Sequence, residues 1–469
     1  MLGSMTLLYT LSFCILALSA CVAFVLFLRG PTKYRGPKAG SGGQVSAHIL
    51  VLGDIGRSPR MTYHALSVAK HGGKVKLIGY LESTPHPDIV SNPNIEVIPL
   101  PIPFRLPQGK PVLFLLLAPL KVLFQVCHLA RVLCYQLEPA TWLLVQNPPS
   151  IPTLAIASLT CYLRNTKLTI DWHNYGWSIL ANTRGPTHPL VYISTHYERF
   201  FGRFGHFHLT VTEAMARQLR SPPYNIRNRL VALHDRPAAI FQPILSASTR
   251  EQTLNRVFAN TKEQALIPRL LDGSMRLVVS STSWTPDEDF DLLLDALVEY
   301  ASTKHTTLTA PNVTPVLVVI TGKGPMEKMW FETVADLTRK GQLPHVRITS
   351  TFLPFADYAA LLACADLGIC LHKSTSGVDL PMKVVDMFGA GLPVAAFSGY
   401  ESFSELVREG ENGKGFETAP ELASTLTHLL HRNGQSELDS LKKGAIKEGS
   451  RRWDEEWDSK VGVIMGFKT

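Results

Sequence analysis

The residue types best suited to chemistry lie between residues 374 and 393. Small hydroxyl residues and Gly377 open this stretch, and Lys383 and Asp386 follow in a helical pattern. A helix that begins after a strand and a Ser/Gly loop presents amides to an anion. Ser376, Gly377 and Lys383 therefore predict a diphosphate site, with Asp386 placed for the hydroxyls of a ribose. The alternative is a surface helix whose charges are solvated.

A second candidate group follows a predicted strand near residue 170. It contains Asp171 and His173, and Asn174 and Tyr175 are candidates for the loop that contacts an acceptor. Parallel sheets bind ligands at the carboxyl ends of their strands, and a histidine can accept a proton near neutral pH. We expect Asp171 or His173 to be a general base, with Asp54 as the next candidate. Alternatively, Asp171 caps a turn and His173 packs beside the neighbouring tryptophan.

The loop after the first predicted strand contains three more candidates for acceptor contacts. These are Gly53, Gly56 and Arg57. Glycines there let the backbone approach a ligand closely.

Further candidates for donor contacts are spread over the second half of the chain. Ser281 and Ser283 precede a predicted helix, and Lys323 and Gly324 lie in a glycine turn after a strand. Arg236 could reach a diphosphate or form a salt bridge within a linker.

The elements that must position these residues form two sets of alternating strands and helices. The first set opens with a strand at 45–52, a helix at 60–71 and a strand at 74–79, and the second starts at residue 276. Thr285 before Pro286 predicts a helix N-cap with Pro in the first turn. Alternating strands and helices predict two doubly wound α/β domains.

Composition excludes several classes of protein. The 469 residues are 45 % hydrophobic and 18 % charged, with a net charge of +8, which suits a globular protein with a negatively charged partner. The chain lacks G-x-G-x-x-G and a complete P-loop, which argues against dehydrogenases and ATPases. We find no nucleic-acid motif. The seven cysteines form no C-x-x-C pair, which indicates reduced thiols and no cysteine-bound metal.

Two segments bear on membranes. Residues 6–28 carry no charge and are followed by basic residues, which predicts an uncleaved anchor with its C-terminal side in the cytosol. A cleaved signal peptide is the alternative. Residues 111–131 are strongly apolar, but Pro119, Lys121 and Arg131 interrupt them and disfavour a spanning helix. They predict either a core helix or an amphipathic surface on the membrane.

Four segments carry a resemblance to a known family. They are G-D-I-G-R-S-P at 53–59, D-W-H-N-Y-G at 171–176, S-T-S-W-T-P-D-E-D-F at 281–290 and D-L-P-M-K-V-V-D-M-F-G at 379–389. In these segments the chain resembles the chitobiosyldiphosphodolichol beta-mannosyltransferases, which are glycosyltransferases with the GT-B fold.

The resemblance implies an organisation and a reaction. It implies an anchor at 1–30, a linker at 31–44, an acceptor domain at 45–235, an interdomain linker at 236–271, a nucleotide-sugar domain at 272–440 and a C-terminal helix at 441–469 that packs back on the first domain. It implies transfer from GDP-mannose to dolichyl-diphosphate chitobiose, with inversion and a beta-1,4 linkage. The site would be at the endoplasmic reticulum membrane, facing the cytosol, in contact with the lipid bilayer and with other mannosyltransferases of the pathway. It implies no obligatory metal, although Mg²⁺ could act.

The sequence departs from part of the wider GT-B pattern. Many retaining GT-B enzymes carry a Glu-x7-Glu pair in the second domain; here Asp386 fits the second acid, but Val378 occupies the first position and Asp379 lies one residue away. Either aspartate could contact the donor. Two alternative functions remain: a GT-B transferase with another donor, such as UDP-N-acetylglucosamine, and a non-catalytic scaffold subunit.

Overall fold

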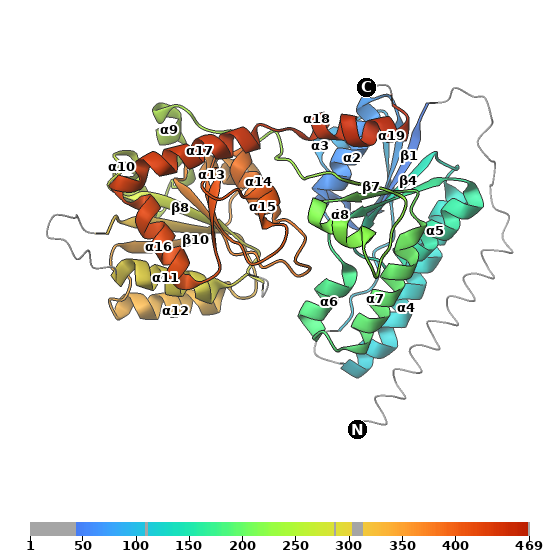
Figure 1. Ribbon diagram of the computed structural model, residues 1–469, viewed down its shortest axis with the longest axis horizontal. Coiled ribbons are helices and arrows are strands. Elements are labelled where there is room, and N and C mark those ends of the chain that lie inside the picture. Colours follow the sequence, from blue (N-terminus) through green and yellow to red (C-terminus); the bar gives the residue numbers. More distant parts are fainter. Residues whose placement is uncertain (1–43, 108–110, 286–287, 303–312, 468–469) are drawn as a thin grey trace. The chain divides into compact units, whose positions relative to one another are not determined.

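A computed structural model of the chain describes residues 44–107, 111–285, 288–302 and 313–467. These residues form two compact units (Figure 1). Unit 1 contains the described residues up to Leu233 and those from Glu456 on, and unit 2 is His234–Glu455. The predicted anchor at 1–30 lies outside the described residues.

Unit 1 is built on a seven-stranded sheet whose paired strands are all parallel, in the order β3-β2-β1-β4-β5-β6-β7. The strands are β1 (Ser46–Asp54), β2 (Lys74–Tyr80), β3 (Ile95–Pro99), β4 (Trp142–Asn147), β5 (Lys167–Trp172), β6 (Phe207–Thr210) and β7 (Arg229–Ala232). The main helices are α2 (Pro59–Lys70), α4 (Pro111–Ala130), α5 (Thr153–Arg164), α6 (Gly176–Arg184), α7 (Pro189–Phe201) and α8 (Glu213–Arg220). Strands buried on both faces read as continuous apolar runs, which is why the first strands were predictable.

The end of the chain packs on unit 1. Trp457 in α18 (Trp453–Trp457) and Val461 in the π-helical η6 (Asp458–Gly462) are fully buried. The indole of Trp142 in β4 donates to the carbonyl of Met465, 3.2 Å away, in α19 (Val463–Met465). The boundary differs from the predicted one, because α17 (Gln435–Gly449) belongs to unit 2 and the return begins at Glu456.

Unit 2 repeats the architecture with a six-stranded parallel sheet in the order β10-β9-β8-β11-β12-β13. The strands are β8 (Arg276–Ser281), β9 (Val316–Thr321), β10 (Val346–Thr351), β11 (Leu367–Cys370), β12 (Val394–Phe397) and β13 (Gly413–Phe416). The longer helices are α9 (Ala247–Val257), α11 (Phe290–Ser302), α12 (Glu327–Arg339), α13 (Phe355–Cys364), α14 (Met382–Gly389), α16 (Ala419–Leu430) and α17.

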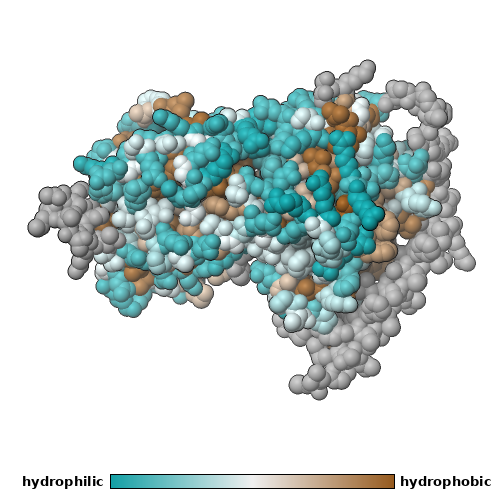
Figure 2. Space-filling model, viewed as in Figure 1, coloured by the Kyte–Doolittle hydropathy of each residue, from teal (hydrophilic) through white to brown (hydrophobic). Residues whose placement is uncertain are grey.

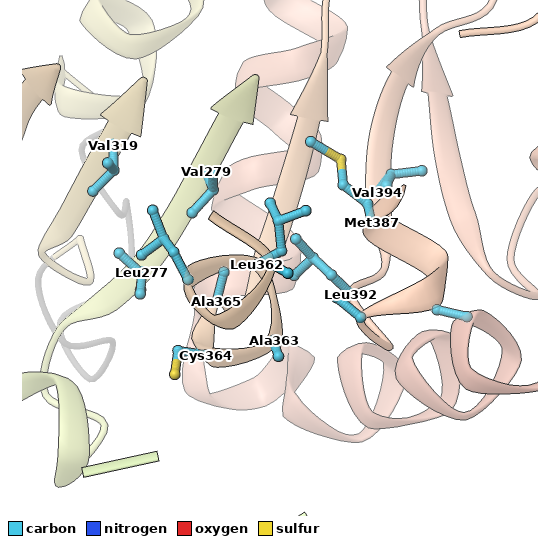
Figure 3. Packing of buried hydrophobic residues seen from close by; sticks show 14 of the residues in the cluster. Leu277, Val279, Val319, Leu362, Ala363, Cys364, Ala365, Met387, Leu392 and Val394 are labelled. Atoms are coloured by element: carbon cyan, nitrogen blue, oxygen red, sulfur yellow. The ribbon is translucent and has the colours of Figure 1, made fainter. Parts of the chain in front are cut away.

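The core of unit 2 corrects the predicted linker at 236–271. In this stretch, Phe241, Leu254 and Leu270 are buried in the same cluster as the strand residues Leu277 and Val319. Figure 3 shows how residues of β8, β9, α13, α14 and β12 meet in that cluster. The stretch is therefore part of unit 2, because its apolar residues cover one side of the sheet.

One predicted helix start in unit 2 is wrong. Helix α11 begins at Phe290, and the carboxylate of Asp289 accepts a hydrogen bond from the Leu292 amide at 3.0 Å. Asp289 therefore provides the N-cap contact that the sequence assigned to Thr285.

The apolar region at 111–131 is a helix with two different halves. In α4, Val112, Leu116 and Leu120 are 50 %, 39 % and 48 % exposed, whereas Leu129 is fully buried. Residues 112–136 are long and apolar enough to cross a membrane by length and composition, with 18 % of the most apolar window buried. The sequence predicted either a core helix or a surface helix on the membrane, and neither describes the whole of α4. Its second half packs into the core at Leu129, whereas its first half exposes apolar side chains.

The described cysteines are free thiols, as the absence of C-x-x-C pairs indicated. Of the five described cysteines, none forms a disulfide; four are buried, and Cys127 is exposed, contrary to its apolar sequence context. Figure 2 shows a mainly hydrophilic visible face on which hydrophobic residues gather in separate patches.

Candidate active site

Asp171 lies near the carboxyl end of β5 and is fully buried in unit 1. Its Oδ2 accepts from Arg60 Nε at 2.8 Å, and its Oδ1 accepts from Arg60 Nη2 at 3.0 Å. Burial alone raises the pKa of a carboxyl group, but the Arg60 charge and two histidines hold the pKa of Asp171 well below its usual value. Asp171 is therefore a fixed anion, and a carboxylate so stabilised is a weak proton acceptor.

His64 completes this buried group and has a defined protonation. Its Nε2 lies 3.1 Å from Asp171 Oδ2, and its Nδ1 lies 2.9 Å from the indole nitrogen of Trp457. An indole N–H can only donate and an ionised carboxylate can only accept. His64 is therefore neutral with its proton on Nε2, and burial lowers its pKa in agreement.

His173 is the partly exposed member of the group. Its Nε2 lies 3.1 Å from Asp171 Oδ2, and its side chain is 24 % exposed. Because the carboxylate only accepts, Nε2 carries the proton, and in the neutral ring Nδ1 is left with a lone pair. Asp171 thus orients the imidazole as the aspartate of a catalytic triad does.

Asp54, the third candidate base, holds two loops together. Its carboxylate accepts from the amides of Gly56 at 3.3 Å, Glu82 at 3.2 Å and Ser83 at 3.1 Å. Partial burial raises its pKa, but the hydrogen bonds from Ser83, Glu82 and Gly56 lower it more. These contacts make Asp54 a structural cap at the end of β1.

The neighbouring glycines and Arg57 differ in their constraints. A Cβ on Gly56 would lie 2.7 Å from the carbonyl oxygen of Thr84, so the two loops can approach only with glycine there. A Cβ on Gly53 would meet only Val51 at an ordinary 3.6 Å. The Arg57 side chain is 83 % exposed.

Asn174 and Tyr175 are part of the packing of the loop after β5. The side-chain oxygen of Asn174 accepts from the Tyr175 amide at 2.7 Å. Tyr175 is buried, stacked between Trp177 and Tyr224 with ring centroids 5.8 and 5.3 Å away. The structure thus places the aromatic ring of Tyr175 in the core of the loop.

A buried glutamate in α7 ties the same loop to the one after β4. Glu198 accepts from the Gly176 amide at 2.8 Å, from Tyr224 Oη at 2.9 Å and from Asn147 Nδ2 at 3.3 Å, and it also contacts Ser150. Burial raises its pKa despite these hydrogen bonds. Glu198 positions both loops at the carboxyl edge of the sheet.

In unit 2, Lys383 is positioned by a buried glutamate. Its ammonium group forms an ion pair with Glu288, which is 3 % exposed. Glu288 also accepts from the Ser283 amide at 3.0 Å and from the Thr282 hydroxyl. This is the one ion pair of Lys383 among the described residues, and it leaves two of the three ammonium donors for a ligand.

The glycine turn after β9 lies against the segment after β8. A Cβ on Gly322 would lie 1.9 Å from the Thr282 carbonyl oxygen, and one on Gly324 would lie 2.1 Å from that of Ser283. Lys323 between them lies over the Phe352 ring, 4.6 Å from its centroid. The structure therefore brings together the predicted donor candidates Ser283, Lys323 and Gly324.

Ser281 and the 374–379 loop are held by local hydrogen bonds. The Ser281 hydroxyl lies 3.0 Å from that of Tyr358. The Gly377 amide donates to the Ser374 hydroxyl at 2.8 Å, and Ser376 Oγ accepts from the Val378 amide at 3.4 Å. Gly377 has a φ of 76°, which explains a glycine at this turn.

The two aspartates left open by the sequence have opposite protonation. Asp379 contacts Ser374 and lies 3.4 Å from His372 Nε2; burial raises its pKa, but these contacts lower it overall. For Asp386 in α14, burial and the charge of Asp235 raise the pKa to about 8. Asp379 is therefore an anion at neutral pH, and Asp386 is mainly a neutral carboxylic acid.

Arg236 forms a salt bridge, which was the alternative to a diphosphate contact. It is 4 % exposed, and its Nη1 donates to Glu448 Oε1 at 2.7 Å. Arg236 is thus part of a buried ion pair with α17.

Four contributing residues were not predicted from the sequence: Arg60, His64, Glu198 and Glu288. A signal for two of them existed, because Arg60 and His64 are four residues apart on α2 and so share one face. Glu288 lies in the segment 281–290 that carries the family resemblance but was not singled out there, and Glu198 gave no local signal. Within the described ranges, no group of three or more His, Cys, Asp or Glu side chains could hold a metal ion.

Comparison with known proteins identifies the family. A chitobiosyldiphosphodolichol beta-mannosyltransferase of Arthroderma benhamiae is 44 % identical over 466 residues, which cover 99 % of this chain and 100 % of that protein. The chain belongs to the chitobiosyldiphosphodolichol beta-mannosyltransferase family. A member from Homo sapiens is 38 % identical over 95 % of this chain and 97 % of its own length. The sequence resemblance is therefore confirmed.

The fold prediction is confirmed as well. Residues 275–432 of this beta-mannosyltransferase family member match the glycosyl transferases group 1 family. The crystal structure of Anabaena HepE with UDP and glucose superposes with a TM-score of 0.60 at 14 % identity, covering 90 % of this chain and 99 % of that one. Sucrose-phosphate synthase from Thermosynechococcus elongatus superposes with a TM-score of 0.56 at 14 % identity, covering 87 % of this chain and 98 % of that one. These neighbours carry the GT-B fold.

Proposed function

We propose that the chain transfers mannose from GDP-mannose to chitobiosyldiphosphodolichol and forms a beta-1,4 linkage with inversion. The observation that carries this proposal is the identity with beta-mannosyltransferases of that name over nearly the whole chain. The buried Arg60–Asp171–His64 group of unit 1 and the Lys383–Glu288 pair of unit 2 also support an enzyme, because a scaffold protein has no need to maintain them.

Inversion is a single displacement. The acceptor hydroxyl attacks the anomeric carbon, the bond from that carbon to the diphosphate breaks, the proton passes to a base and GDP leaves. His173 Nδ1 fits the base, because Asp171 holds the ring and the ring is partly exposed. Asp171 is then a positioning residue, and Asp54 caps its loop.

The departing diphosphate needs positive charge and hydrogen-bond donors. Lys383 supplies a charge that Glu288 orients, and Lys323 supplies a second on the turn packed against Ser283. The neutral form of Asp386 supports a donor site, because it offers a hydroxyl donor to a ribose and adds no negative charge near a diphosphate. In this proposal Arg236 has a structural role.

The test is a transfer assay on the full-length chain in detergent. Phytanyl-diphosphate chitobiose is mixed separately with GDP-mannose, GDP-glucose and UDP-N-acetylglucosamine. We expect product from GDP-mannose alone, released by a beta-mannosidase. Product from another donor would support the alternative transferase. Binding of GDP without transfer from any donor would support the scaffold alternative.

Localisation and metal use belong to the same proposal. We place the enzyme in the endoplasmic reticulum membrane with its two units in the cytosol, and we retain the pathway's other mannosyltransferases as expected partners. Asn312-Val-Thr is a glycosylation sequon, so a luminal orientation would expose it to modification. Glycosidase treatment should leave the electrophoretic mobility of the membrane-bound protein unchanged.

Metal use is tested by chelation. EDTA should leave transfer measurable, since the charges proposed to stabilise the diphosphate belong to the protein.

A further inference from the structure

We propose that a cavity in unit 1, between α4 and the carboxyl ends of β1, β2 and β4, holds the diphosphate of a lipid-linked acceptor. The exposed apolar side of α4 takes the first part of the polyprenyl chain. This inference rests on the proposed function and adds to it a binding site with named residues.

The cavity has a volume of about 370 Å³, within the range of small-molecule sites. Tyr80, the last residue of β2, and Gln125 of α4 line it, and Gln125 Nε2 donates to Tyr80 Oη at 3.0 Å. It opens at the carboxyl edge of the sheet, the edge that also carries Asp171 and His173. An acceptor seated there enters from the side of the sheet on which the proposed base lies.

Two cations face this cavity. Arg105 follows β3, and Lys121 lies in the middle of α4. In the part of the chain that the structure describes, neither side chain has an ion-pair partner. The lining contains one acid, Glu82, so the cations outnumber it. Two cations match the two charges of a diphosphate diester.

An apolar stripe on α4 leads to the cavity. Val112, Leu116 and Leu120 are four residues apart, so they lie on one face of the helix, and all three are exposed. Lys121 is the next residue after the stripe, and Ile102, which is 54 % exposed, lies in the cavity lining. At about 100° per residue, Lys121 is turned by this angle around the helix from Leu120, so the stripe lies on the face next to the cavity lining and Leu120 is its residue nearest to Lys121 in the chain.

The other side of α4 explains why this face is open. α4 packs on α5, and α5 packs on α7, so these helices lie along one side of the unit (Figure 1). The exposed stripe is the side that this packing leaves uncovered. The nine residues from 112 to 120 span eight helical rises, about 12 Å, which is enough for several carbons of a polyprenyl chain. The cavity has cations and the neighbouring helix face is apolar, so a diphosphate joined to a hydrocarbon chain is the ligand that matches both.

The first experiment tests the cations in the full-length protein. In the double variant Arg105→Gln/Lys121→Gln, we expect the KM for phytanyl-diphosphate chitobiose to rise about tenfold or more, while the KM for GDP-mannose stays unchanged. Lys121→Arg should retain a low KM. Arg227→Gln, an exposed arginine of the same unit outside the cavity, is the matched control. An unchanged acceptor KM in the folded double variant overturns the proposal.

A binding experiment separates this inference from the proposed function. Phytanyl diphosphate without sugar is titrated calorimetrically into wild type and the double variant. If wild type transfers no mannose yet binds this probe with the expected cation dependence, the proposed function fails and the site stands. If wild type transfers mannose but the two proteins bind the probe equally, the site fails and the function stands.

The stripe is tested by chain length. Wild type should prefer a long polyprenyl acceptor over a farnesyl one, and Val112→Gln/Leu116→Gln/Leu120→Gln should lose that preference several-fold. Leu245→Gln, at a residue 83 % exposed in unit 2, is the control. The triple variant could instead lose binding to phosphatidylcholine vesicles and keep the chain-length preference. That result would assign the stripe to the bilayer and overturn this half of the proposal.

Discussion

Two aspartates, one in each unit, show how environment decides what a carboxyl group can do. Asp171 is fully buried but faces Arg60 and two histidines, and its pKa lies well below the usual value. For Asp386, burial and the charge of Asp235 act together, and its pKa rises to about 8. At neutral pH the first is an anion that orients a base, and the second is an acid that keeps its proton.

This difference has opposite consequences for the pH dependence of stability. A carboxyl whose folded pKa is depressed stabilises the fold above its unfolded pKa, near 4, and this contribution is lost as pH falls through the folded value. A carboxyl whose folded pKa is raised stabilises the fold in its protonated state, and stability falls as pH rises from about 4 to about 8. The following four predictions test this comparison, from the largest expected effect to the smallest.

Asp171→Asn should have the largest effect. It removes the counter-charge of Arg60, which is 3 % exposed, and should lower the free energy of unfolding by about 3–5 kcal/mol as well as abolish transfer. Urea denaturation measures the first effect. The control is Asp336→Asn, which breaks an exposed ion pair with Lys340 and should leave stability unchanged. A folded, equally stable Asp171→Asn protein would contradict the buried-pair interpretation.

His173→Ala should affect catalysis with little loss of stability. We expect kcat to fall about 100-fold or more, because the base is lost, while the protein unfolds near the wild-type urea concentration. His196→Ala, at an exposed histidine of α7, serves as the control. A rate within a few-fold of wild type would remove His173 as the base.

Asp386→Asn should be nearly neutral at pH 4 and stabilising at pH 8. Asparagine resembles the protonated acid, so it cannot lose a proton as the pH rises. Chemical denaturation across pH 4 to 9 should show the advantage of the variant growing through this range and levelling off above about pH 8. A constant difference across the range would mean that Asp386 titrates normally. Asp336→Asn is again the control from the same unit.

Asp235→Asn should give the smallest change. Because the charge of Asp235 contributes to the raised pKa of Asp386, its removal should move the midpoint of the stability change to lower pH without abolishing it. The same denaturation series reports that midpoint. A midpoint that stays in place or moves to higher pH would show that burial alone sets the protonation of Asp386.

Local patterns were enough for most of the architecture. Buried parallel strands such as β1 (Ser46–Asp54) and β2 (Lys74–Tyr80) are apolar runs that end near a glycine, and they were predicted directly at 45–52 and 74–79. β7 (Arg229–Ala232) and β13 (Gly413–Phe416) were missed, because neither is a distinct apolar run. The predicted linker was wrong for a related reason: its apolar residues are spaced among charges, and only the packed sheet shows that they are buried.

The candidate site divides in the same way. The sequence by itself determined the family, the two α/β units and the positions of Asp171, His173 and Lys383 at strand ends and a helix start, because motif spelling and periodicity are local properties. Only the tertiary structure decided their chemical states. Arg60 and Asp171 are far apart in the chain, as are Glu288 and Lys383, and protonation depends on which charges and how much water surround a group after folding.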